Sequence, residues 1–368
     1  MNVAHASAPG KLVVLGEYAV LEGHSALALA VDRRVKASAH RIQQAEIELC
    51  LPPLCPKPLR LPISASLEGR KGLNAGEGIP KLGSDLAWVL DELVPMLVSW
   101  SQEDVLYPQH HGLALSIDST ALYGSSQQKL GLGSSAAVAV AVAGVMLALG
   151  GQSLAISTLH QRVHRDHQGG KGSGIDVAAC LSGGVIRYSM MSSSNQEPHW
   201  QRLAMWPDSL SGSIIHVKQS ASTPQLIDAF KHWKRESPEA FKRNLSAMVA
   251  CADQAEQAFL NEDWLAFLEG FTEYGERVGR MGDEMGQALY SEPHRLVSQL
   301  ARTRGLAYKP CGAGMGDVGL LLSNDQDRAA SACEVLAGMG FGILPLTVAE
   351  QGLCVNGESP WSEAGQSS

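Results

Sequence analysis

Residues 129–149 join a short loop of glycine and serine to an apolar run that is rich in alanine. The loop reads Gly131-Leu132-Gly133-Ser134-Ser135. Glycine permits a tight turn and close approach of the backbone, and serine at a helix start accepts hydrogen bonds from unpaired backbone N–H groups. The N–H groups and the dipole at a helix N-terminus favour an anion. The pattern indicates a phosphate-binding loop rather than an ordinary loop and cap.

The apolar run 136–149 predicts a buried helix, because it has no polar face. At 1.5 Å per residue the run spans about 21 Å, less than the roughly 30 Å of a bilayer core. Its small side chains favour close packing against a sheet over a membrane span.

A lysine follows a Pro-Gly turn near the N-terminus, in the order Ala8-Pro9-Gly10-Lys11. A lysine at the mouth of a strand can reach a phosphate as a point charge. A solvated surface lysine is the alternative on this stretch alone, and both interpretations stay open at this point.

A second glycine-rich turn, residues 169–174, leads into an apolar helix that begins near Ile175 and carries Asp176. The helix dipole alone would favour an acid in the first turn. The position of this acid just inside an apolar helix start also suggests a partner cation.

The third glycine-rich stretch runs from Cys311 to Asp317 and precedes an apolar strand. Consecutive backbone N–H groups in such a turn can form an anion-binding nest, and a plain connection is the competing interpretation. The chain lacks the P-loop pattern, the protein-kinase motifs, the HExxH motif and the GxSxG elbow. Any phosphate chemistry is therefore of another type.

Composition limits the class of protein. A chain of 368 residues, 45% apolar, predicts about two globular domains. The net charge of −8 argues against a nucleic-acid surface and against a basic membrane contact. The seven cysteines are scattered and odd in number, and the N-terminus lacks the features of a signal peptide. We therefore expect a cytoplasmic protein with reduced thiols.

Hydrophobic periodicity predicts an α+β protein with domains over 1–195 and 196–355 and a disordered tail over 356–368. The Pro9-Gly10 pair is expected to separate two short strands, and residues 51–80 are expected to be irregular. Strands are predicted at 3–8, 12–15, 25–39, 112–118, 185–188, 318–322 and 342–346, and further helices at 81–99, 153–168, 223–235, 238–260, 263–289, 293–304 and 325–339.

Three segments, APGKLVVLGEYAVLEG, KLGLGSSAA and CGAGMGDVG, resemble in this order the three motifs of the GHMP small-molecule kinases. The resemblance spans about residues 7–322, although 41–111 and 224–305 carry no motif. It implies an N-terminal domain like that of ribosomal protein S5 and a ferredoxin-like C-terminal domain, with ATP bound between them.

Within this family the pattern is most similar to that of the phosphomevalonate kinases. Tyr18 stands where mevalonate kinases carry a histidine, and Arg165 stands where they carry a magnesium-binding glutamate. Cys311 and Met315 depart from the usual serine and glycine of phosphomevalonate kinases. The resemblance implies phosphoryl transfer from ATP to (R)-5-phosphomevalonate in isoprenoid synthesis. A kinase for an alcohol such as mevalonate or a sugar, and a non-catalytic sensor of ATP, are the alternatives.

The resemblance also implies roles for single residues. Lys11 would bridge the donor and acceptor phosphoryl groups beside Asp176, and Ser134 or Ser135 would bind Mg²⁺. The ATP phosphates would contact Lys129, Gly131, Leu132, Gly133, Ser134, Ser135 and Ala136. The acceptor, a small phosphorylated acid, would contact Lys11, Tyr18, Ser173, Lys218, Ser222, Thr223, Gly312 and Gly314. We expect ATP and Mg²⁺ as cofactors, no nucleic acid or membrane as a partner, and a monomer or homodimer.

Overall fold

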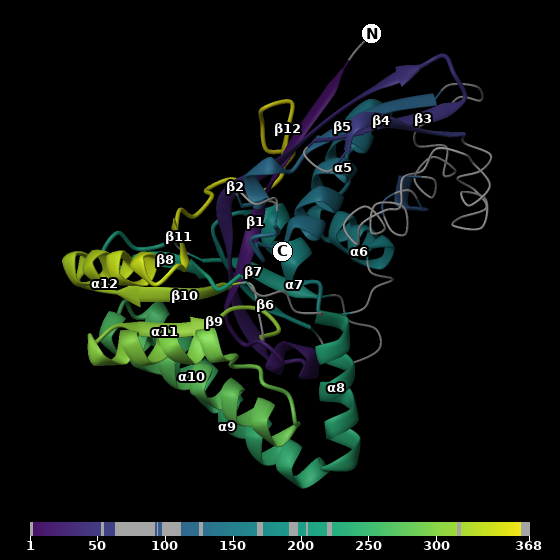
Figure 1. Ribbon diagram of the computed structural model, residues 1–368. Helices are drawn as coiled ribbons and strands as arrows, with labels where there is room; N and C mark the ends of the chain where they lie inside the picture. Colours follow the sequence, from purple (N-terminus) through teal and green to yellow (C-terminus); the bar gives the residue numbers. More distant parts are fainter. Residues whose placement is uncertain are drawn as a thin grey trace.

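The computed structural model describes residues 3–52, 55–62, 93, 95–97, 112–124, 128–167, 172–190, 198–203, 205–218, 223–314 and 318–361. They form two β-sheets, and helices pack against both (Figure 1). The α+β class predicted from the sequence is confirmed.

The larger sheet is built mainly from the N-terminal half of the chain. Its main path runs in the order β12-β1-β2-β5-β3-β4, with β6 paired to β2 and β7 paired to β6. All pairs are antiparallel except β3 with β5. The strands are β1 (Ala4–Leu15), β2 (Ser25–Ile42), β3 (Glu46–Leu51), β4 (Cys55–Pro62), β5 (Gly112–Asp118), β6 (Val185–Ser189), β7 (His199–Arg202) and β12 (Cys354–Val355).

Strand β1 is continuous, so the predicted turn at Pro9-Gly10 is wrong. The strand pairs with β2 along its whole length, and its register shifts between Pro9 and Gly10. A shift of this kind accommodates a residue that has no N–H to donate, because the ladder is interrupted there in any case. The prediction of an irregular 51–80 is likewise wrong for β4, while residues 63–80 lie outside the described part of the chain.

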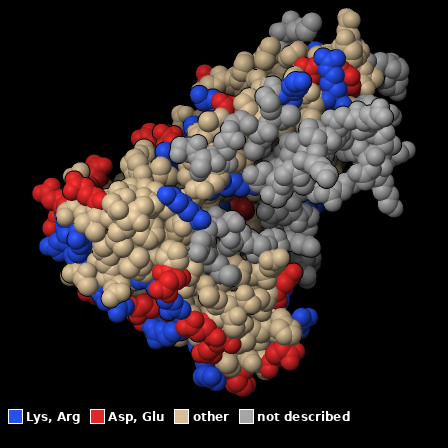
Figure 2. All heavy atoms as spheres, viewed as in Figure 1, with Lys and Arg blue, Asp and Glu red and all other residues tan. Residues whose placement is uncertain are grey.

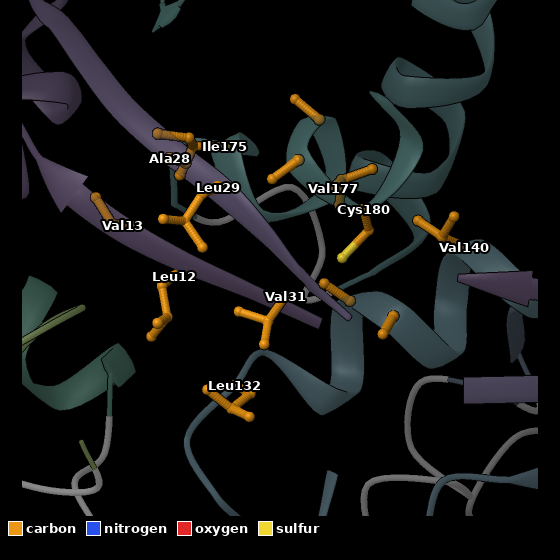
Figure 3. Packing of buried hydrophobic residues seen from close by; sticks show 14 of the residues in the cluster. Leu12, Val13, Ala28, Leu29, Val31, Leu132, Val140, Ile175, Val177 and Cys180 are labelled. Carbon is orange, nitrogen blue, oxygen red and sulfur yellow. The ribbon is translucent and has the colours of Figure 1, made fainter. Parts of the chain in front are cut away.

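Three helices pack on or beside this sheet: α5 (Ser134–Gly150), α6 (Ile156–Asp166) and α7 (Ile175–Ser182). Residues 136–147 of α5 are buried, as the absence of a polar face predicts. Close packing depends on Gly144, because a Cβ there would lie 3.0 Å from the Cβ of Ala6 in β1. Figure 3 shows Val140 of α5 and Val177 of α7 within the same cluster as Leu12 and Val31 of the sheet.

The smaller sheet has the order β11-β8-β10-β9 and is antiparallel throughout. Helices α10 and α11 contact β9, and α12 contacts the other three strands. The elements are β8 (Ser211–His216), α8 (Thr223–Glu236), α9 (Pro238–Leu260), α10 (Trp264–Glu284), α11 (Glu292–Thr303), β9 (Ala307–Pro310), β10 (Val318–Ser323), α12 (Gln326–Gly338) and β11 (Gly342–Pro345). The predicted helix 81–99 lies mostly outside the described residues.

The C-terminal segment crosses back to the larger sheet, where β12 pairs with β1. The Asn356 N–H donates to the carbonyl of His5 at 2.8 Å, and the Trp361 indole donates to the carbonyl of Leu154 at 3.0 Å. The prediction of a disordered tail is therefore wrong for residues 356–361, and residues 362–368 lie outside the described chain. The boundary between 195 and 196 stays a prediction.

The described surface does not gather one sign of charge over the helices α9–α11. In Figure 2 acidic and basic side chains alternate there, and several of them pair, as Arg277 does with Glu273 and Arg302 with Glu276. None of the described helices combines the length and the apolar character that spanning a bilayer would require.

Candidate active site

Lys11 on β1 packs against the glycine-serine loop that leads into α5. Its backbone N–H donates to the carbonyl of Leu132 at 2.8 Å. Its aliphatic stem lies on Gly133, where a Cβ would come within 2.7 Å of Lys11 Cε and 2.8 Å of Cγ. Gly10 permits the same contact from the strand, because a Cβ there would lie 2.8 Å from the Leu132 carbonyl oxygen. The two segments predicted to hold phosphate therefore meet at one place.

The loop presents the N-terminus of α5 beside this lysine. Gly131 and Gly133 have φ values of 68° and 72°, in the left-handed region that favours glycine. Leu132 is buried and anchors the loop in the core (Figure 3). Ser134 and Ser135 are half-buried in the first turn, where backbone N–H groups have no acceptor within the helix. This geometry suits a phosphate group, with Ala136 buried behind it.

Asp176 lies in the first turn of α7, and its Oδ1 accepts a hydrogen bond from the Val177 N–H at 3.0 Å. Burial raises the pKa of this carboxyl, but Lys11, His167, the Val177 N–H and His164 together outweigh burial and leave the pKa below its usual value. Asp176 is therefore an anion at neutral pH, within the electrostatic reach of Lys11. Among the charged groups, Lys11 lowers this pKa the most, and its pairing with Asp176 stays a prediction.

Aromatic side chains support the turn before Asp176. His160 of α6 is buried and pairs through Nε2 with the carbonyl of Gly174 at 2.9 Å, which indicates that Nε2 carries the proton. The Tyr188 hydroxyl donates to the carbonyl of Ser173. The ring of Trp200 packs on His160 with centroids 4.8 Å apart. These contacts were not identified from the sequence, because the three residues come from separate elements and share only their burial.

The pKa of His160 predicts a loss of stability on acidification. Burial is the main cause that lowers this pKa from 6.5 to about 4. Between pH 6.5 and 4, His160 is protonated in the unfolded chain but stays neutral in the folded chain. The contribution of His160 to the free energy of unfolding is therefore complete above pH 6.5 and decreases as the pH falls from 6.5 to 4. A shift of this size corresponds to at most about 3 kcal/mol. Urea unfolding across this pH range should show the decline, and His160→Phe should remove this part of the slope. An unchanged slope in the variant would contradict the assignment.

The third glycine-rich loop approaches the first motif through Tyr18. Gly312 and Gly314 have φ values of 82° and 88°, and the carbonyl of Ala313 between them accepts a hydrogen bond from the Tyr18 hydroxyl at 2.5 Å. Burial, with a smaller effect of Glu17, raises the pKa of Tyr18 far above its usual value, so the hydroxyl stays protonated and donates. Tyr18, predicted to contact the acceptor, is buried and engaged with the loop itself.

The other predicted acceptor residues are more scattered. Lys218 lies after β8 with φ 59°, and its ammonium donates to the carbonyl of Gly340 at 2.6 Å, at the C-terminal end of α12. Arg187, a further basic residue on β6, pairs with buried Glu256 at 2.6 Å. Ser173 is half-buried in the turn before α7, and Thr223 begins α8. Ser222 lies outside the described residues, so its role stays a prediction.

A magnesium ion would fit this site only together with the nucleotide. Among the described residues no group of three or more histidine, cysteine, aspartate or glutamate side chains could hold a metal. Mg²⁺ keeps several waters and is usually held by one or two protein oxygens plus substrate phosphates. The hydroxyl groups of Ser134 and Ser135 at the start of α5 suit this mode.

Comparison with known proteins gives a consistent result. Residues 101–184 match the family model of the GHMP kinases N terminal domain. The chain is 26% identical to a phosphomevalonate kinase from a Streptomyces species, over 94% of this chain and 97% of that protein. It is 27% identical to a mevalonate kinase from Thermococcus gammatolerans, over 90% and 93% of the two chains. The structure of Streptococcus pneumoniae phosphomevalonate kinase in complex with phosphomevalonate and AMPPNP aligns with a TM-score of 0.71 at 17% identity, over 94% of this chain and 99% of that chain.

The fold and the loop–helix arrangement are those of a small-molecule kinase. The chain is similar to the GHMP kinases through the model match at residues 101–184 and through relatives at 26–27% identity over most of its length. The family resemblance seen in the sequence is confirmed, and ATP is the phosphoryl donor that this family uses.

The start of α5 supplies a prediction about nucleotide use. Ser135→Ala should lower activity at limiting Mg·ATP, on the order of tenfold, because a neutral hydroxyl ligand contributes about 1–2 kcal/mol. The fold should remain, since Ser135 is half-buried in the first turn of α5 and the N-cap of this helix is Gly133. Steady-state kinetics with varied Mg²⁺ and ATP would measure the change, and circular dichroism would control for folding. Unaltered turnover would place the phosphate site elsewhere.

Proposed function

We propose that this GHMP kinase transfers the γ-phosphoryl group of ATP to (R)-5-phosphomevalonate and forms 5-diphosphomevalonate, in the mevalonate pathway of isoprenoid synthesis. The observation that carries the proposal is the contact of Lys11 with the loop that begins α5, and the charge of Lys11 also helps to keep Asp176 ionised. The reaction joins two anions, so positioning and charge neutralisation dominate its catalysis. In a chain of net charge −8 a local concentration of positive potential has to supply this.

The roles of the residues follow from their positions. An oxygen of the acceptor phosphate attacks the γ-phosphorus, the bond from that phosphorus to the β,γ-bridging oxygen breaks, and ADP leaves. Lys11 neutralises charge on both phosphoryl groups as they meet, and Asp176 holds the Lys11 ammonium in place by its charge. The N–H groups of Ser134 and Ser135 bind the donor phosphates. Mg²⁺, when bound with ATP, would neutralise further charge on the triphosphate.

One feature of the chain favours a phosphorylated acceptor over an alcohol, and the chemistry of such an acceptor is compatible with the site. Arg165 occupies the place of the magnesium-binding glutamate of mevalonate kinases, and it is exposed and paired with Asp166 at 3.0 Å. A phosphate monoester is also largely ionised at pH 7, so it needs no base to remove a proton.

Mevalonate is the second candidate acceptor, because the curated mevalonate kinases are as similar as the phosphomevalonate kinase is. A non-catalytic sensor is disfavoured by the presence of both Lys11 and Asp176. We expect the protein to act in the cytoplasm as a monomer or homodimer, on small molecules only.

A coupled assay of ADP release tests the proposal. The acceptors would be phosphomevalonate, mevalonate, galactose and homoserine, each with Mg·ATP, and a reaction without acceptor would measure ATP hydrolysis. We expect the highest kcat/KM for phosphomevalonate. A higher kcat/KM for mevalonate would replace the proposed acceptor, and no release above the background would favour the sensor.

A further inference from the structure

A buried ion pair lies behind the proposed site. The Lys309 ammonium contacts Glu17 Oε1 at 2.5 Å, and the two side chains are 1% and 5% exposed. Glu17 Oε2 is buried as well and accepts no hydrogen bond from the described residues. Removing two charges from water has a large desolvation free energy, which their attraction offsets only when the geometry is good. Such a pair is therefore better evidence for a fixed arrangement than for stability. The kinase reaction derived above uses neither residue.

Helix α10 packs against this ion pair. The Tyr274 hydroxyl donates to the backbone carbonyl of Glu17 at 2.7 Å. The Lys309 ammonium lies 5.3 Å from the centre of the Phe271 ring, within the range of a cation–π contact. Gly275 allows the close approach, because a Cβ there would lie 2.5 Å from Lys309 Cβ. The pair is thus held in one orientation by the face of α10 that packs against it.

Each member of the pair is next to one of the segments that carry the chemistry. Glu17 follows β1, the strand of Lys11, and stands between Gly16 and Tyr18, whose φ values are 91° and 66°. A tyrosine at positive φ is strained, and such strain persists only where the surroundings fix it. Lys309 lies in β9, immediately before the glycine loop 311–314.

Cys311, the first residue of the glycine loop, lies within the electrostatic influence of this pair. Burial raises the pKa of its thiol to about 11, while Lys309 and Lys11 lower it and Glu17 raises it further. Residues 16–18, which follow β1, thus have two contacts in this region. The Glu17–Lys309 pair joins them to β9, and the hydrogen bond from Tyr18 to Ala313 joins them to the glycine loop.

We propose that Glu17 and Lys309 are a positioning pair for phosphoryl transfer: their contact fixes the glycine loop 311–314 relative to the strand that carries Lys11. The pair thereby sets where the acceptor lies with respect to the transferring phosphoryl group, without touching either. The inference rests on the proposed kinase reaction, whichever acceptor the assay above identifies. The competing role is a purely structural one, in which the pair contributes to folding alone.

Three variants separate the two roles: Lys309→Met, Glu17→Gln and the double variant with both changes. Lys309→Met leaves a buried carboxylate without its cation, so its melting temperature should fall. The double variant contains no buried charge and should recover most of that temperature. Lys234→Met is the matched control, because it breaks a half-exposed pair with Glu22 at 2.6 Å in the same region.

The kinetics of the double variant decide between the roles. With the ionic contact gone, we expect kcat/KM for the acceptor to remain at least about tenfold below wild type, the scale of a small misplacement at the reacting centre. The KM for ATP should change less than twofold, since the start of α5 is untouched. Amide hydrogen exchange in residues 307–314 should be faster than in the wild type. The control should match the wild type in all three measurements.

Recovery of acceptor kinetics and loop exchange along with the melting temperature in the double variant would overturn the positioning role. So would a Lys309→Met variant that loses only thermal stability. If the wild type phosphorylates no acceptor, the proposed function fails instead. The exchange of residues 307–314 would then still decide whether the pair fixes the loop, because it requires no turnover.

Discussion

Lys11→Met should lower kcat by roughly 10³-fold or more, the scale on which a single cation contributes to phosphoryl transfer. Methionine keeps the length of the stem that lies on Gly133 and removes only the charge. The fold should therefore survive, and ATP should still bind at the start of α5. Stopped and continuous assays of ADP release would measure kcat, and calorimetry with an ATP analogue would confirm that nucleotide binding is retained. Substantial activity in this variant would remove Lys11 from the reaction.

Asp176→Asn tells which kind of acceptor the site serves. A hydroxyl keeps its proton at neutral pH, so a kinase for an alcohol gains about 10²–10⁴-fold from a base. A phosphate acceptor needs none, and Asp176 would act only by holding Lys11. We therefore expect the asparagine variant to be clearly less damaged than Lys11→Met. An equal loss concentrated in kcat would indicate a hydroxyl acceptor.

The sequence alone was sufficient for features that depend on local order. The apolar run after Ser135 needs a buried helix in any fold, and glycines at positions 131 and 133 allow the left-handed turn before it. The approach of Lys11 to this loop could be expected only through the family resemblance. No local sequence pattern predicts that the backbone of β1 donates a hydrogen bond to the Leu132 carbonyl.

Features that depend on distant partners were missed. Pro9-Gly10 is a turn by local preference, yet β2 holds it within a strand. The tail looks polar, yet Asn356 and Trp361 find acceptors on the larger sheet. In each case the deciding contact is made by residues far away in the chain.

Charged residues are the hardest to place from the sequence. Lys309 is 1% exposed, whereas Lys218, predicted at the acceptor site, donates to the Gly340 carbonyl just beyond α12. Only tertiary packing distinguishes the two lysines, because Lys309 is buried where the Glu17 carboxylate pairs with it. The positions of the domain boundary and of Ser222 stay predictions.

Gly133→Val is expected to be nearly as damaging to activity as the loss of the lysine charge. The residue has φ 72°, which a β-branched side chain adopts only at a cost of about 1–3 kcal/mol. Its Cβ would also lie 2.7 Å from Lys11 Cε, so the lysine stem has to move away from the phosphate loop.

Gly151→Val is the matched control for this substitution. Gly151 caps the other end of α5 with φ 62°, and a Cβ there would have nothing within 4 Å. Both variants should lose stability through the strained backbone, which thermal unfolding would measure. Only Gly133→Val should lose kcat, by about 10²-fold or more, because it alone displaces the catalytic cation by an ångström or so. If the two variants lose activity equally, the damage comes from the strain in α5, and the contact between Gly133 and Lys11 has no catalytic role.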